Sequence, residues 1–200
     1  MLKVTDITIP ELEPISFELT AGECLGVSGE SGCGKTRLLR AIADMDEIEG
    51  LVCVDDICQP DVSGANWRKQ VALLPAESQW WFDTVAPHFP DDVDYSALGF
   101  TEQVKGWSIS RCSSGEKQRL SILRLLANKP QVLLLDEPTA NLDAENARKV
   151  EAVIATYLET HKATAIWVSH DRAQLERVAS KRYFDFSKNL MVLLAKGDSK

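Results

Sequence analysis

A glycine-rich segment near residue 30 constrains the fold more than any other feature of the chain. Residues 29–36 read Gly-Glu-Ser-Gly-Cys-Gly-Lys-Thr and match the pattern G-x-x-x-x-G-K-[ST]. The segment follows a short apolar run at residues 24–27, which predicts a buried strand, and precedes a helical pattern over residues 37–43. In this setting the backbone N–H groups of the turn converge on an anion. The sequence therefore predicts a phosphate-binding loop on an α/β core.

The residues of this loop have distinct expected roles. The helix N-terminus adds positive potential, Lys35 supplies a full charge to the β- and γ-phosphates of a nucleotide, and the Thr36 hydroxyl is placed to ligate Mg²⁺. The alternative is a glycine-rich turn without a ligand, which is disfavoured because both the pattern and its strand–helix setting match. The candidate nucleotide-binding residues here are Gly29, Glu30, Ser31, Gly32, Cys33, Gly34, Lys35, Thr36 and Arg37.

A second motif ends in two carboxylates. Four apolar residues, 132–135, predict a strand buried on both faces, and Asp136 and Glu137 follow directly. Ligands of open α/β sheets gather at the carboxyl ends of the strands. We expect Asp136 to hold Mg²⁺ and Glu137 to orient and deprotonate the attacking water. An acidic pair after a strand is common by itself. Together with the phosphate-binding loop around Lys35, this pair strongly indicates a nucleotide-binding site.

Together the two motifs resemble those of the nucleotide-binding subunits of ATP-binding cassette (ABC) transporters. In that family a Leu-Ser-Gly-Gly-Gln signature precedes the acidic strand, and here residues 112–116 read Cys-Ser-Ser-Gly-Glu. Three of the five positions differ, whereas Ser113 and Gly115 remain, and the family uses the hydroxyl and backbone of these positions on ATP. The plain alternative is that Ser113 only caps a helix.

The resemblance continues beyond the acidic strand. Residues 138–143 look like the family's loop that links the glutamate to the dimer interface, and Asp143 is implied as a nucleotide-binding residue. His170 follows a predicted strand at residues 164–168; in the family this histidine reaches the γ-phosphate and helps organise the water. A lone histidine at a strand end is more often structural, but its place after Asp143 favours catalysis. The resemblance thus implies Glu137 and His170 as catalytic residues, with ATP and Mg²⁺ as cofactors.

The chain departs from the family pattern in the loop after residues 71–74. The family has a glutamine there that contacts Mg²⁺ and senses the membrane partner, whereas this chain has Ala76, with Glu77 beside it and Gln79 nearby. We expect normal Mg-ATP binding with slow hydrolysis, unless Glu77 or Gln79 substitutes. Three aromatic residues follow at 80–82; they either contact the membrane partner or pack the chain's own core.

The position of the family's adenine-stacking aromatic is also altered. It usually lies near the end of the first strand, where residues 9–12 read Ile-Pro-Glu-Leu. We expect the base to be held by apolar packing.

The length fits a single domain, and the resemblance implies one ABC ATPase domain over residues 1–200. The expected fold class is α/β: a P-loop NTPase (RecA-like) core with a small antiparallel β subdomain and a shortened helical subdomain. The helical part is expected as an insertion at approximately residues 77–114, where periodicity fades. Strands are expected at residues 4–9, 15–19, 24–27, 51–54, 71–74, 132–135 and 164–168. A hairpin is expected from residues 183–186 and 190–194, around Lys188 and Asn189. Helices are expected at residues 37–43, from residue 115, at 150–158 and at 171–179.

Composition excludes other classes. The net charge of −8 and pI near 5.0 argue against nucleic acid as a partner, and the longest apolar run, 190–195, is too short to insert into a membrane. The N-terminus lacks the apolar stretch of a signal peptide, so a cytoplasmic location is expected, peripheral at the membrane's cytoplasmic face when assembled. The five cysteines form no CxxC pair and are expected as free thiols.

The leading hypothesis is an ATP-hydrolysing transporter subunit. One phosphate loop and one signature make two half-sites, which the family completes in trans, so we expect a homodimer around two Mg-ATP that drives separately encoded membrane permease subunits. One alternative is a soluble, non-transport ABC-type ATP switch. Another is a degenerate protein that binds ATP without hydrolysing it, which Ala76 favours and Glu137 and His170 oppose.

Overall fold

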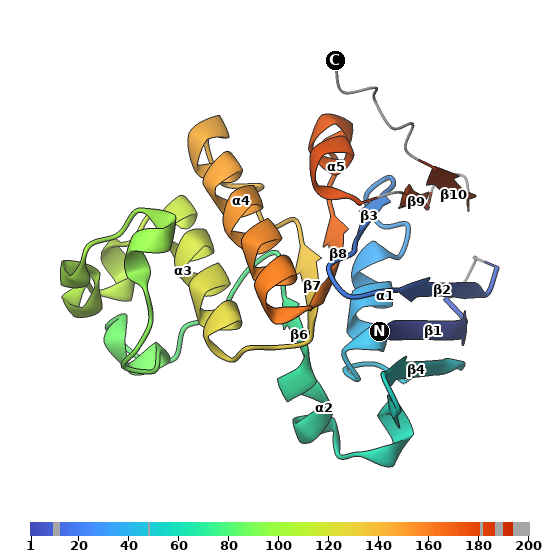
Figure 1. Ribbon diagram of the computed structural model, residues 1–200. Helices are drawn as coiled ribbons and strands as arrows, with labels where there is room; N and C mark the ends of the chain where they lie inside the picture. Colours follow the sequence, from blue (N-terminus) through green and yellow to red (C-terminus); the bar gives the residue numbers. More distant parts are fainter. Residues whose placement is uncertain (10–12, 48, 181, 187–189, 194–200) are drawn as a thin grey trace.

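The computed structural model describes residues 1–9, 13–47, 49–180, 182–186 and 190–193, which form two sheets and five α-helices within these ranges (Figure 1). The strands are β1 (Leu2–Ile7), β2 (Ile15–Leu19), β3 (Cys24–Ser28), β4 (Leu51–Val54), β5 (Ile57–Cys58), β6 (Val71–Leu74), β7 (Val132–Asp136), β8 (Thr164–Val168), β9 (Arg182–Asp185) and β10 (Leu190–Leu193). The α-helices are α1 (Lys35–Ile42), α2 (Gly64–Gln70), α3 (Ser114–Ala127), α4 (Ala144–His161) and α5 (Arg172–Val178).

The smaller sheet has the order β2-β1-β4-β5 and is antiparallel throughout. Its strands alternate buried apolar with exposed polar residues, as in β2, where Ile15, Phe17 and Leu19 face the core. β1 begins and ends two residues earlier than the predicted strand at 4–9, and a register shift between Val4 and Ile7 accompanies the positive φ of Asp6. The predicted antiparallel β subdomain is confirmed.

The larger sheet has the order β10-β9-β3-β8-β7-β6. β6, β7, β8, β3 and β9 run parallel, and β10 pairs antiparallel with β9 at the edge, as the predicted hairpin requires; Lys188, Asn189 and Leu194 lie outside the described residues. Successive residues of β7 belong to different hydrophobic clusters. Leu134 packs in the cluster that includes α1 and the small sheet, whereas Leu133 and Leu135 pack in the cluster that includes α3, α4 and α5. The parallel order brings the carboxyl ends of β3 and β7 to one edge.

The segment between β6 and α3 contains no α-helix. It is formed by four 3-10 helices at Ala86–His88, Tyr95–Leu98, Glu102–Gly106 and Ile109–Arg111, beside α3 in Figure 1. The helices of the partly helical insertion expected there are short 3-10 helices. α2, which the sequence pattern did not predict, is anchored by Trp67, whose indole donates to Ile42 O at the end of α1.

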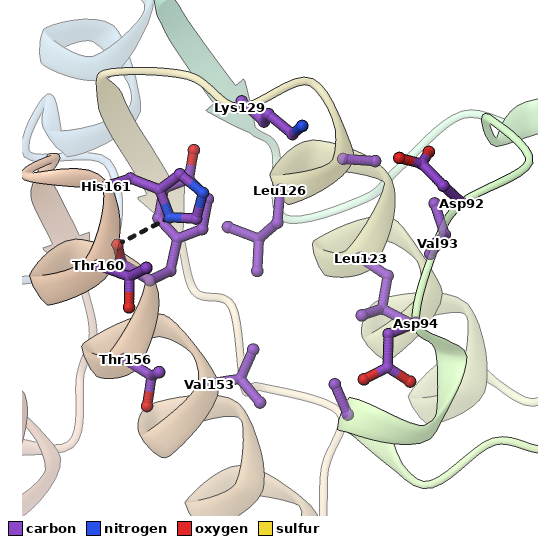
Figure 2. A pocket seen from close by; sticks show the side chains of 13 residues that line it. Asp92, Val93, Asp94, Leu123, Leu126, Lys129, Val153, Thr156, Thr160 and His161 are labelled. Carbon is purple, nitrogen blue, oxygen red and sulfur yellow. Dashed lines mark hydrogen bonds between the residues drawn. The ribbon is translucent and has the colours of Figure 1, made fainter.

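Where this segment meets α3 and α4, a pocket of about 420 Å³ remains. Figure 2 shows Leu126 and Val153 near its centre, Asp92 and Asp94 on one side beside Leu123, and Thr156, Thr160 and His161 on the other. It contains none of the predicted nucleotide-binding residues, so this pocket lies apart from the site described below.

The pairing of Cys53 and Cys58 corrects the expectation that all five cysteines are free thiols. The two residues face each other across β4 and β5 and are joined by a disulfide. Their spacing escapes a search for CxxC, but a tight turn with Asp55 at φ 51 folds the second strand back onto the first. Cys24, Cys33 and Cys112 are free thiols.

No helix within the described ranges is both long and apolar enough to span a membrane.

Candidate nucleotide-binding site

The glycine-rich loop links the end of β3 to the start of α1. Gly32 and Gly34 have φ of 81° and 106°, in the left-handed region that disfavours residues with a Cβ. A Cβ on Gly32 would meet nothing within 4 Å, so glycine is needed there for backbone conformation and not for space. Gly34 occupies the N-cap of α1 without a side-chain cap, which leaves the N–H groups of the first turn available to an anion.

Lys35 is held inside this loop. Its Nζ donates to the carbonyl oxygens of Gly29 and Glu30, both at 2.8 Å, and lies 3.8 Å from Cys33 Sγ. The side chain is 7% exposed. A full positive charge is therefore positioned at the centre of the loop, which is the arrangement expected for binding phosphate.

Thr36 and Asp136 meet although 100 residues separate them in sequence. Thr36 Oγ1 donates to Asp136 Oδ2 at 2.7 Å, and Asp136, at the end of β7, is buried. The contact follows from the sheet order, because α1 packs on β7. A hydroxyl and a carboxylate oxygen side by side make the hard oxygen donor set that Mg²⁺ prefers, so these residues fit the metal.

Glu137 and His170 form the other side of the site. His170 Nε2 lies 2.9 Å from Glu137 Oε1, and the histidine side chain is 52% exposed against 22% for the glutamate. Glu137 has φ of 50°, an uncommon conformation for a non-glycine residue, while its N–H donates to Val168 O. Such backbone conformations concentrate at functional sites. The geometry places a carboxylate and an imidazole side by side at the carboxyl ends of β7 and β8.

These residues line one pocket of about 390 Å³. The pocket brings together most of the candidates from the loop and the strand ends, and it adds Ala76. Gly29, Glu30 and Cys33 do not line it; the first two instead hold Lys35 through their carbonyl groups. The lining residues are Ser31, Gly32, Gly34, Lys35, Thr36, Arg37, Ala76, Asp136, Glu137 and His170.

The loop after β6 brings Ala76, and neither Glu77 nor Gln79, into this lining. Gln79 is held by its main chain, whose carbonyl accepts from Arg124 Nη1 at 3.0 Å. The alanine methyl thus lies where the resemblance would put the glutamine. At the position of the family's adenine-stacking aromatic, Ile9 is buried. Residues 10–12 lie outside the described residues.

The signature residues lie apart from the pocket, at the start of α3. Ser113 caps the helix: its Oγ accepts from Glu116 N, and its N–H and Oγ both donate to Glu116 Oε2. The backbone N–H of Ser113 lowers the pKa of Glu116. Cys112, in place of the family's leucine, is buried, and burial raises the pKa of its thiol, so it behaves as a small apolar residue.

Gly115 is required by a close approach between two segments. A Cβ there would lie 2.9 Å from Asn141 O, in the loop that precedes α4. Asp143 caps α4 and accepts from Asn146 N and Nδ2, both at 2.8 Å; the backbone N–H of Asn146 lowers the pKa of Asp143. Ser113, Gly115 and Asp143 therefore lie outside the pocket lining.

Sequence reasoning missed two buried glutamines that hold the loop at residues 138–143. Gln118 Nε2 donates to Pro138 O at 3.2 Å, and Gln174 Nε2 donates to Thr139 Oγ1 at 2.8 Å. Both side chains are 4% exposed. The only available signal was a polar residue within each helix at a position facing the core, which is rarely enough to assign a role.

Comparisons with known proteins identify the family. The family model described as ABC transporter matches residues 12–140. The aliphatic sulfonates import ATP-binding protein of Bacillus cereus is 34% identical, over 82% of this chain and 69% of that protein. The probable iron export ATP-binding protein FetA of Escherichia coli is 30% identical, over 82% of this chain and 80% of that protein.

Solved structures have the same fold. A dimeric ATP-binding cassette, MJ0796, bound to ADP and phosphate has a TM-score of 0.79 at 21% identity, over 98% of this chain and 100% of that one. An ATP-bound bacterial Atm1-family exporter has a TM-score of 0.78 at 20% identity, but the match spans 36% of that longer chain and 92% of this one. The predicted P-loop NTPase fold is confirmed. The chain belongs to the ABC transporter family as a nucleotide-binding domain, and it is an ATPase of that family.

Proposed function

We propose that this chain is the ATP-hydrolysing subunit of an ABC transporter, that two copies close around two Mg-ATP, and that the dimer drives separately encoded membrane permease subunits from the cytoplasmic face of a membrane. Residues 1–200 form one ATPase domain in this proposal, with residues 77–114 as its insertion. Relatives named for sulfonate import and for iron export are similarly distant from this chain. We therefore assign selection of the transported substrate to the membrane subunits.

The proposal rests on one observation: the pocket residues and the signature residues lie in different parts of the chain. The pocket gathers Lys35, Thr36, Asp136, Glu137 and His170. The signature residues occupy another part of the chain, at the exposed N-terminus of α3. If this signature acts on a nucleotide, that nucleotide is held by another copy, because the signature does not line its own chain's pocket. The similar solved cassette is a dimer, which supports a dimer here as well.

Each pocket residue has a role in this proposal. Lys35 and the loop N–H groups bind the phosphates, while Thr36 and Asp136 hold Mg²⁺, which would neutralise charge on the phosphates when bound. Glu137 accepts the proton of the attacking water, and His170, whose Nε2 lies 2.9 Å from Glu137 Oε1, holds that carboxylate in place. Positioning and electrostatics account for most of the catalysis in phosphoryl transfer.

A mixing experiment tests the arrangement in trans. Ser113→Arg should retain ATP affinity as a monomer and fail to form the closed dimer, because a long cation replaces the helix cap at the proposed interface. Mixed with a Lys35→Ala chain, it should recover at most one competent site per heterodimer, measured as phosphate release. Ser63→Arg, which removes the serine cap of α2, controls for the loss of about 1 kcal/mol of stability. A mixture that stays inactive would contradict sites completed in trans.

The second prediction concerns Ala76. Mg²⁺ readily keeps waters in place of a missing ligand, so binding is unaffected, but the attacking water lacks one orienting amide. Ala76→Gln should raise ATP turnover severalfold with little change in nucleotide affinity, because this position lines the pocket. Glu77→Ala and Gln79→Ala serve as controls and should leave turnover near the wild-type value. A fall in turnover for either control, with no effect of Ala76→Gln, would assign the role to that residue instead.

The aromatic residues after β6 are proposed to contact the membrane partner. Trp81 and Phe82 are 64% and 47% exposed, whereas Trp80 is half-buried and packs against the apolar cluster around α3 and α4. His88 lies within 5.1 Å of both exposed rings, centre to centre. Exposed aromatic rings on a fixed support are typical of protein interfaces.

A further inference from the structure

Both polar atoms of the buried Gln174 side chain, on α5, are hydrogen-bonded. Nε2 donates to Thr139 Oγ1 at 2.8 Å and to Glu151 Oε1 at 2.9 Å, which uses both of its hydrogens. Oε1 accepts from Trp167 Nε1 at 3.3 Å and lies 3.1 Å from Thr139 Oγ1. Gln174 does not line the nucleotide pocket. Its side chain therefore acts on other residues of the chain and does not touch the nucleotide.

Glu151 and Trp167 fix which way the amide of Gln174 points. Arg177 donates to both carboxylate oxygens of Glu151, from Nη2 at 2.8 Å and from Nε at 3.1 Å. Burial alone would raise the pKa of Glu151, but the hydrogen bonds from Arg177 and Gln174 lower it, so this carboxylate is ionised. An ionised carboxylate only accepts hydrogen bonds and an indole N–H only donates them. The NH₂ group must therefore face Glu151, and the amide oxygen must face Trp167.

The hydrogen bonds of Gln174 connect the two segments that carry Glu137 and His170. Thr139 lies two residues after Glu137, in a turn closed by a backbone N–H that donates to Glu137 O at 3.2 Å. Trp167 is buried in β8, three residues before His170. A second pocket, of about 610 Å³, is lined by Gln174 and Thr139 and shares Glu137 and His170 with the nucleotide pocket. Gln174 thus ties the turn after Glu137 to the strand that leads to His170.

We infer that Gln174 is a positioning residue for ATP hydrolysis, which acts through Thr139 on the placement of the Glu137 carboxylate. This inference rests on the proposed role of Glu137 as the base. Glu137 has a positive φ, a conformation that persists only where the surrounding structure holds it. Misplacing a reacting group by about 1 Å can reduce the rate by about 10²-fold. ATP binding depends instead on the loop around Lys35, which none of these hydrogen bonds reaches.

Thr139→Val and Gln174→Leu each remove one partner of the hydrogen bond at 2.8 Å and keep a side chain of similar size. Each should lower ATP turnover of the full chain by about 10- to 10²-fold, with the affinity for a fluorescent ATP analogue within about twofold of wild type. The double variant should be no slower than the slower single variant, because both act through one contact. Thr139→Ser keeps the hydroxyl and should retain most of the turnover. All rates are measured below the melting temperature of every variant.

A charge swap tests the orientation of the amide. Gln174→Glu alone brings a second carboxylate against Glu151 and removes its amide donor, so turnover should fall. Adding Glu151→Gln restores one donor and one acceptor at this contact, while Trp167 Nε1 and the Thr139 hydroxyl can donate to the carboxylate at position 174. The swapped chain should return to within about threefold of the wild-type turnover. This rescue requires the contact itself, since each substitution alone disrupts it.

Glu176→Gln is the matched control, because Glu176 lies on the same helix, is paired with Arg172 at the surface and lines neither pocket. It should leave turnover unchanged. Wild-type turnover of Thr139→Val, additive losses in its double variant with Gln174→Leu, or no recovery in the swapped chain would overturn the inference. Lower melting temperatures without slower turnover would also overturn it and leave a purely structural role.

The Glu137→Gln chain separates this inference from the proposed function on which it rests. If Glu137→Gln hydrolyses ATP at full rate, the proposed base and the positioning role of Gln174 are rejected together. If Glu137→Gln loses turnover while Gln174→Leu and Thr139→Val keep it, the base stands and only the positioning role is rejected.

Discussion

Glu137→Gln is expected to reduce ATP turnover by about 10²–10⁴-fold while ATP binding survives, because the amide keeps the shape of the side chain but cannot accept the proton of the attacking water. His170 Nε2 lies 2.9 Å from Glu137 Oε1, and an amide oxygen in the same place can keep this contact. The pocket should therefore keep its geometry, and the ATP-loaded dimer should accumulate.

Phosphate release and light scattering with saturating Mg-ATP measure both parts of this expectation. Glu145→Gln is the control, since Glu145 lies in the first turn of α4, is paired with Lys149 and does not line the pocket. It should turn over ATP at the wild-type rate. A Glu137→Gln chain that stays monomeric with ATP, or that hydrolyses ATP at full rate, would exclude Glu137 as the base.

Lys35→Ala is expected to weaken ATP binding by about 10²-fold or more, because in the proposed function it removes a charge that contacts two phosphates. The substitution acts on ATP binding, which comes before the chemical step, so ATP turnover should be lost together with binding. The substitution also leaves the carbonyl groups of Gly29 and Glu30 without the ammonium donor that now lies at 2.8 Å from each. Water can replace that donor in an open pocket, so the melting temperature should change little compared with the affinity.

Equilibrium binding of a fluorescent ATP analogue, together with thermal melting, separates these effects. Lys149→Ala removes an exposed lysine from a pair within α4 and should alter neither quantity. Unchanged nucleotide affinity in the Lys35→Ala chain would contradict the phosphate-binding role of the loop. A large drop in melting temperature would instead show that Lys35 acts chiefly in holding the loop together.

Local patterns in the sequence predicted the elements that carry the site. The strands at 15–19, 51–54, 71–74 and 164–168 have the predicted bounds, because alternating or continuous apolar residues define a strand without reference to the rest of the chain. The glycine-rich loop was predictable for the same reason: the positive φ of Gly32 and Gly34 is a local requirement. α2 and the two-residue strand β5 were missed because their stability comes from contacts such as Trp67 with α1 and Cys53 with Cys58.

The sequence by itself therefore determined the class of fold, the phosphate-binding loop and the acidic end of β7. Only the tertiary structure decided which of these residues meet: Thr36 reaches Asp136 because the order β3-β8-β7 brings distant segments to one edge, and sequence spacing does not reveal strand order. It also decided that Ala76 lines the pocket, that Gly115 lies against Asn141 O, and that Arg124 lies over the rings of Trp80 and Trp81. These are contacts between elements far apart in the chain, and they depend on packing that local periodicity does not encode.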